Sequence, residues 1–107
     1  MSTKSVSKLK AKRALNDKGG KYILKLFVAG ISPNSFRAIE NINVICEKYL
    51  KGKYELEVID IYQQPTLAHK EEIITIPVLI KKFPSPEVRL IGDLSDTKIV
   101  LKELRLV

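Results

Sequence analysis

The chain has 107 residues, which is enough for one domain with its own hydrophobic core. Hydrophobic residues make up 45% and charged residues 29%, and no apolar run approaches the roughly 20 residues of a membrane-spanning helix. One cysteine excludes an internal disulfide, and one cysteine with one histidine excludes a zinc site of the usual kind. Since no secretory signal is apparent either, we expect a cytoplasmic protein without a metal or cofactor.

The net charge of +7 is concentrated at the N-terminus. Residues 1–21 hold seven basic side chains against Asp17 alone, so the remainder is almost neutral. We expect residues 1–20 to be a flexible basic extension and residues 21–107 to form the domain. The alternative is an arm that attracts phosphates or acidic surfaces. No aromatic residue precedes Tyr22, so the extension lacks a platform for stacking bases, and nucleic-acid binding is disfavoured.

The first element is a short apolar run over residues 22–29, interrupted only by Lys25. This pattern predicts a strand that is covered on both faces, as in a parallel or mixed sheet with packed helices. Ser32 and Pro33 then form a helix start, with serine as the cap and proline at the first helical position. Thioredoxin-like domains begin in this way. Ser32 and Ser35 occupy the places of the cysteines in a redox Cys-x-x-Cys turn, which excludes thiol chemistry there.

The next residues alternate between helical and strand patterns. Residues 35–50 carry an apolar stripe, which predicts a helix that ends at Gly52. Cys46 lies on this stripe and is interpreted as a core residue. Residues 54–61 predict a second strand, joined to the first by a right-handed parallel crossover. The members of the stripe are Phe36, Ile39, Ile42, Cys46, Tyr49 and Leu50.

The second half predicts a short helix over residues 65–72, with His69 exposed, and then a strand over residues 73–80. Pro77 belongs at the start or the edge of that strand. Trans is the commoner isomer of an Ile-Pro bond, while thioredoxin-like folds place a cis proline here, so both remain open. Residues 87–92 predict an antiparallel strand, and residues 97–106 a capped helix. The predicted fold is therefore α/β, in the order βαβαββα with a mixed sheet.

Four stretches give the chain its resemblance to a known family. They are YILKLFVAGISPNSFRA at 22–38, YELEVIDI at 54–61, residues 75–79 around Pro77, and FPSPEVRLIGDLSD at 83–96. The sequence resembles the KaiB family of the bacterial circadian clock. The resemblance implies a thioredoxin-like, non-enzymatic regulator that binds KaiC, an ATP-hydrolysing ring, and acts beside KaiA-like or SasA-like proteins. It leaves open whether that role lies in a clock or in stress adaptation.

The resemblance also implies which residues contact a partner. These candidates are Tyr62, Gln63, Gln64, Pro65, Ala68, Glu71, Glu72 and Thr75, together with the basic residues Lys25, Arg37 and Lys81. For the three basic residues, a solvated surface charge is an equally good interpretation. Glu72 stands where the family typically has lysine, so either the partner surface differs or binding to KaiC is weaker.

The family is metamorphic, which implies a tetrameric ground state with a different C-terminal half beside the thioredoxin-like form. Self-association as a dimer or tetramer is compatible with this. Glu103 and Arg105 replace a glycine and an aspartate that are usual in the family. Glutamate favours a helix interior over glycine by about 0.5–1 kcal/mol. Arginine near a helix C-terminus adds about 0.3–1 kcal/mol. We therefore expect the thioredoxin-like form to be more populated here, with Pro77, Gly92 and Asp93 as further structural positions.

Two other functions are compatible with the residues alone. One is a thioredoxin-like interaction domain that does not bind KaiC, and the other is a nucleic-acid-associated protein that uses the basic extension. A redox enzyme of the thioredoxin type is disfavoured because the Cys-x-x-Cys motif is absent.

Overall fold

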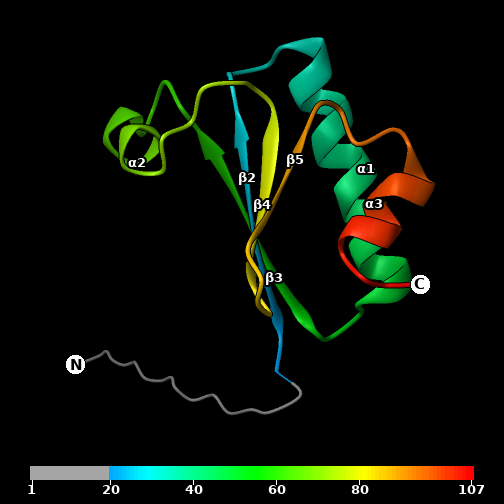
Figure 1. Ribbon diagram of the computed structural model, residues 1–107. Coiled ribbons are helices and arrows are strands. Elements are labelled where there is room, and N and C mark those ends of the chain that lie inside the picture. The colour runs from blue at the N-terminus through cyan, green and yellow to red at the C-terminus, as the bar shows by residue number, and fades with distance from the viewer. Residues whose placement is uncertain (1–19) are drawn as a thin grey trace.

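The computed structural model describes residues 20–107, so the expectations for the basic extension lie outside the described residues. The elements are β2 (Tyr22–Val28), α1 (Pro33–Tyr49), β3 (Tyr54–Asp60), α2 (Pro65–Lys70), β4 (Val78–Phe83), β5 (Val88–Ile91) and α3 (Thr97–Glu103). Figure 1 shows α1 and α3 on one face of the sheet and α2 on the other. Within residues 20–107, no helix is both long and apolar enough to pass through a membrane.

The sheet is mixed and is built around β2. Its strand order is β3-β2-β4-β5. β2 pairs in parallel with β3, from Tyr22 opposite Tyr54 to Val28 opposite Asp60, and antiparallel with β4. β5 adds to β4 in the antiparallel sense. The predicted order βαβαββα and the parallel crossover are therefore confirmed.

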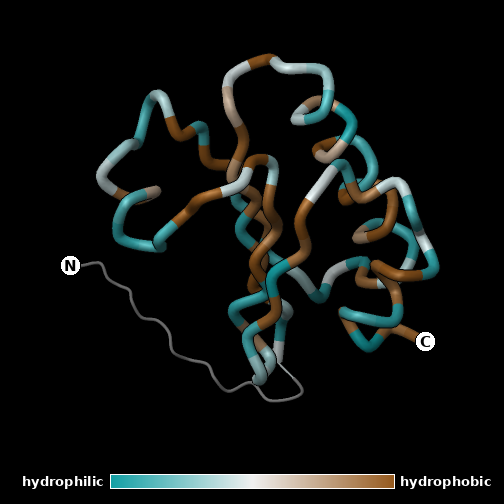
Figure 2. Tube along the Cα trace, turned by 45° about the horizontal axis from the view of Figure 1, so that its top comes forward, coloured by the Kyte–Doolittle hydropathy of each residue, from teal (hydrophilic) through white to brown (hydrophobic). Residues whose placement is uncertain are grey.

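β2 is buried from both sides, as its apolar run predicted. One core lies between the sheet and the pair α1 and α3, and a smaller one lies under α2. Figure 2 shows the hydrophobic colour running along the central strands. Each fully buried leucine or phenylalanine in such a core stabilises the fold by about 1.5–3 kcal/mol. The β2 side chains of the larger core are Leu24, Leu26 and Val28, and that of the smaller core is Phe27.

Helix α1 begins as predicted, but its buried face is rotated relative to the apolar stripe that the sequence predicted. The Ser32 hydroxyl accepts a hydrogen bond from the backbone N–H of Ser35, and Pro33 is the first helical residue. Phe36 and Tyr49 are exposed, whereas Ile45 is buried, so that part of the stripe was wrong. The core face follows the line of Ser35, Ala38, Ile42, Ile45 and Cys46, which leaves residue 36 just outside it. Burial raises the pKa of Cys46 to about 12, consistent with a core thiol.

Helix α3 ends at Glu103, three residues earlier than predicted, and Arg105 lies beyond it with a φ of 60°. Leu106 N–H donates to the Leu101 carbonyl and Arg105 N–H to the Lys102 carbonyl, which is a Schellman motif. The turn returns Leu106 to the core. The placement of Glu103 in a helix interior was therefore wrong. Its carboxylate lies in the last turn, where the helix dipole disfavours a negative charge.

The three X-Pro bonds that precede Pro77, Pro84 and Pro86 are cis. The open alternative at Ile76-Pro77 is therefore resolved in favour of the isomer found in thioredoxin-like folds. The predicted strand over residues 73–80 was wrong in its bounds, since β4 begins at Val78 and runs to Phe83. Pro77 lies directly before β4, so the strand start is realised of the two places that were left open for it.

Candidate protein-docking surface

The turn at the head of α1 is held by two serine hydroxyls. Ser32 donates its hydroxyl to Ser35 Oγ over 2.9 Å, and Ala29 N–H donates to the same oxygen over 3.1 Å. Ser35 is fully buried, so its hydroxyl is satisfied inside the fold. A serine hydroxyl stays protonated near neutral pH, and no base contacts this pair within the described residues. The turn therefore joins β2 to α1 and presents no activated nucleophile.

Asp60, at the end of β3, ties two loops together. Its Oδ1 accepts hydrogen bonds from Gly30 N–H at 3.3 Å and from Tyr62 N–H at 2.8 Å. The Tyr62 ring then lies beside Gly30, where a Cβ would come within 3.7 Å of it. Gly30 has a φ of 56°, which favours glycine over other residues. Asp60 was not among the predicted site residues, although an aspartate before a turn is a known signal for such bonds.

Three large apolar side chains are exposed at the end of the sheet where β2 and β3 finish. Ile31 is 91% exposed, Tyr62 74% and Ile74 93%. They belong to the β2–α1 loop, the β3–α2 loop and the α2–β4 segment, and Figure 1 shows all three segments at the upper end of the sheet. We call these three residues the loop-end surface. Large exposed apolar residues that share one end of a fold mark a candidate site for binding another macromolecule.

Helix α2 places most of the predicted partner-binding residues beside this surface. Gln63, Gln64 and Pro65 are exposed in the turn before it and at its start, and Thr75 is exposed in the segment after it. Ala68 is half-buried and packs on the smaller core, so its role is partly structural. Glu72 is exposed and has a φ of 56°, which directs the chain out of the helix.

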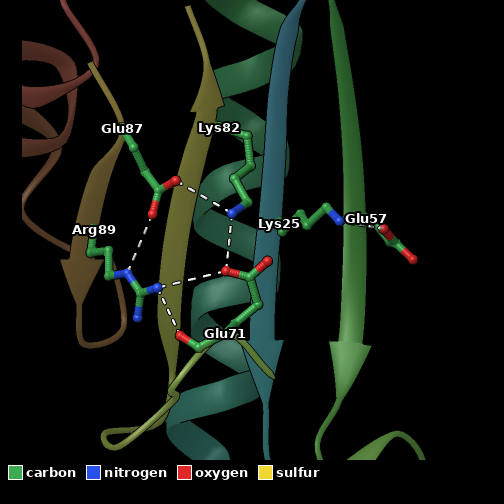
Figure 3. A network of polar contacts seen from close by, with 6 residues as sticks. All are labelled: Lys25, Glu57, Glu71, Lys82, Glu87 and Arg89. Atoms are coloured by element: carbon green, nitrogen blue, oxygen red, sulfur yellow. Dashed lines mark hydrogen bonds and ion pairs between the residues drawn. The ribbon is translucent and has the colours of Figure 1, made fainter. Parts of the chain in front are cut away.

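Glu71 lies in a network of charges rather than in open solvent (Figure 3). Its side chain is 15% exposed, and its Oε1 lies 2.9 Å from Lys82 Nζ and 3.6 Å from Arg89 Nη2. Glu87 completes the network at 3.3 Å from Lys82 and 3.7 Å from Arg89. The hydrogen bond from Lys82 lowers the pKa of Glu71 and raises that of Lys82.

The three basic candidates lie apart from one another. Lys25 is half-buried on the face that carries α2, 3.9 Å from Glu57. Arg37 is exposed on α1 and donates to Asp93 over 3.1 Å and to Asn34.

Lys81 is 1% exposed, which corrects the expectation that it contacts a partner or lies in solvent. Alternation along β4 places it on the same face as Leu79, under α1 and α3. This burial lowers its pKa.

The remaining structural positions join the end of β5 to its neighbours: Gly92 to the start of β4, and Asp93 to α1. Gly92 N–H donates to the Pro77 carbonyl over 2.9 Å with a φ of 109°, so the end of β5 is fixed beside the start of β4. The Asp93 carbonyl accepts from Asn41 Nδ2 over 2.8 Å. Bonds from Ser95 and Arg37 lower the pKa of the Asp93 carboxyl.

A comparison with protein-family models matches residues 25–106 to the KaiB domain. The chain belongs to the KaiB family. Among curated relatives, the circadian clock oscillator protein KaiB of Prochlorococcus marinus (strain MIT 9312) is 50% identical over 86 residues, covering 80% of this chain and 82% of its own. The protein of the same name from Thermosynechococcus vestitus is 49% identical, covering 80% of each chain.

Solved structures place this KaiB-family chain among thioredoxin-like folds. The N-terminal domain of SasA from Synechococcus elongatus has a TM-score of 0.67 and 23% identity, covering 88% of this chain and 92% of that domain. Chloroplastic thioredoxin z also has a TM-score of 0.67, with 18% identity over 82% of this chain and 80% of its own. At these identities the likeness supports the fold alone, and it confirms the predicted fold class.

Proposed function

We propose that this KaiB-family protein is a regulatory binding protein that docks on a KaiC-type ATPase through the loop-end surface. The observation that carries the proposal is the exposure of Ile31, Tyr62 and Ile74 at the end of the sheet where the α1 turn holds two serines. That end is rich in apolar surface and poor in reactive groups, which favours binding over catalysis.

Two further observations support a role beside other clock proteins. The curated relatives are named circadian clock oscillator proteins, and the fold is shared with the N-terminal domain of SasA. KaiA-like and SasA-like regulators are therefore our candidates for additional partners. The exposed residues of the turn before α2, Gln63, Gln64 and Pro65, would form the polar margin of the contact.

The test is binding of the purified protein to the KaiC-type ATPase of its own organism, with and without ATP, by biolayer interferometry. Tyr62→Ala and Ile74→Ala should each weaken binding by about tenfold or more, as expected for large apolar side chains at the centre of a contact. Val44→Ala is the matched control, because Val44 is 65% exposed on the outer side of α1. Wild-type protein that fails to bind, or a control that weakens binding as much as Tyr62→Ala, would refute the proposal.

A further inference from the structure

Helix α2 is too short to be stable or correctly placed by itself. It has six residues, its N-cap residue Gln64 makes no side-chain capping bond, and none of its residues is buried. Isolated helices shorter than about 12–15 residues are marginal in water. The placement of α2 and of the segment that carries Ile74 must therefore come from contacts with the rest of the protein.

Apolar contacts supply part of that placement. Leu67 and Ala68 from α2, and Ile73 from the segment after it, pack on the smaller core. Such contacts favour burial but have little directional preference. They bring α2 to the sheet without fixing its rotation.

Glu71, the C-cap residue of α2, makes directional contacts to two strands. Lys82 Nζ on β4 donates to its carboxylate over 2.9 Å, and Arg89 Nη2 on β5 donates to its backbone carbonyl over 2.7 Å (Figure 3). The arginine also places a positive charge at the C-terminal end of the helix, where it is favourable. Charge-assisted bonds of this kind fix geometry more strictly than neutral ones.

We propose that Glu71 is a positioning residue that fastens α2 and the Ile74 segment to the sheet through Lys82 and Arg89. This inference rests on the proposed function, because the segment that it fastens carries part of the loop-end surface. Glu71 then acts on partner binding through Ile74 and does not contact the partner itself. The low exposure of its side chain agrees with this, since its carboxylate is already engaged inside the protein.

The test compares Glu71→Gln with Glu57→Gln, a glutamate on the same sheet face whose one ion pair, among the described residues, is the 3.9 Å contact with Lys25. Amide hydrogen exchange is measured at Glu72 and Ile73, whose N–H groups bond to the His69 and Ala68 carbonyls. Affinity for the KaiC-type ATPase is measured in parallel. Glu71→Gln should raise exchange at these amides and lower affinity, each by about tenfold, the loss expected for a charge-assisted bond. Glu57→Gln should change neither.

Two additional measurements separate positioning from contact and from general destabilisation. Arg89→Lys keeps the charge but removes the fork geometry that reaches the carbonyl, so it should raise exchange at the same amides. The double variant Glu71→Gln/Lys82→Gln should change amide exchange and affinity by less than the product of the two single-variant effects, because both substitutions remove the same bond.

Affinity that falls without faster exchange would mean that Glu71 touches the partner, and faster exchange with unchanged affinity would mean that the fastening is irrelevant to docking. Either result overturns the inference. If wild type and Glu57→Gln both fail to bind, the proposed function fails, and the exchange rates still decide whether Glu71 fastens the segment.

Discussion

Lys81 gives the strongest stability prediction, for the variant Lys81→Met. The ammonium group is carried on β4 between Leu24 of β2 and Val88 of β5, and its side chain is 1% exposed. Among residues 20–107 it makes no hydrogen bond or ion pair, and the nearby charge of Arg105 also opposes its ionisation. Methionine has a similar length and shape without the charge, so it can occupy the same space.

The expected gain follows from removing an unpaired charge from a buried site. Replacing buried charges by apolar residues of similar volume stabilises proteins by up to about 1–4 kcal/mol. The flexible lysine stem lets the ammonium approach water after a small rearrangement, so we expect the lower part of that range. A gain of about 1–2 kcal/mol raises the melting temperature by roughly 5–15 °C in a domain of this size.

The assay is urea and thermal denaturation at neutral and alkaline pH, with Lys98→Met as the control because Lys98 is exposed on α3. Burial lowers the pKa of folded Lys81 below the ordinary 10.5, so the unfolded state holds the proton to higher pH. Wild-type stability at this site therefore rises with pH between the lowered pKa and 10.5, and the advantage of Lys81→Met shrinks there. A destabilised variant, or an advantage that does not change with pH relative to Lys98→Met, would refute the reasoning.

Three further predictions follow from other contacts. Asp60→Ala leaves two backbone N–H groups without their acceptor and should lower the free energy of unfolding by about 1–3 kcal/mol, measured by urea denaturation; an unchanged free energy of unfolding would contradict it. Arg105→Gly relieves the left-handed backbone at residue 105 and should raise the stability of the thioredoxin-like form by about 0.5–1 kcal/mol, measured by urea denaturation. In the wild type, an NMR strand signature for residues 97–106 would count against a helical α3. The Cys46 thiol, with a pKa of about 12, should react with a disulfide reagent only after denaturation, and rapid labelling of the native protein would disprove its burial.

Local patterns predicted the parts of the fold that local residues determine. The apolar run of β2, the Ser32-Pro33 start of α1 and the parallel crossover to β3 each depend on adjacent residues and simple connection rules.

The errors concern choices that distant residues decide. Lys81 and Lys82 are adjacent and point to opposite faces, and only the packing of α1 and α3 decides which of them is buried. The end of α3 is set by the return of Leu106 to the core, which places Arg105 in a conformation that usually requires glycine. Glu71 meets partners 11 and 18 residues away, and no spacing rule in the sequence indicates such a network.

The pair of hydroxyls at the head of α1 has a consequence for signalling. A thioredoxin changes state when its two thiols are oxidised, but Ser32 and Ser35 keep the same bond in reducing and oxidising surroundings. The chain has one thiol, and Cys46 is buried in the core. The turn that joins β2 to α1 therefore keeps its hydrogen bond whatever the redox poise of its surroundings.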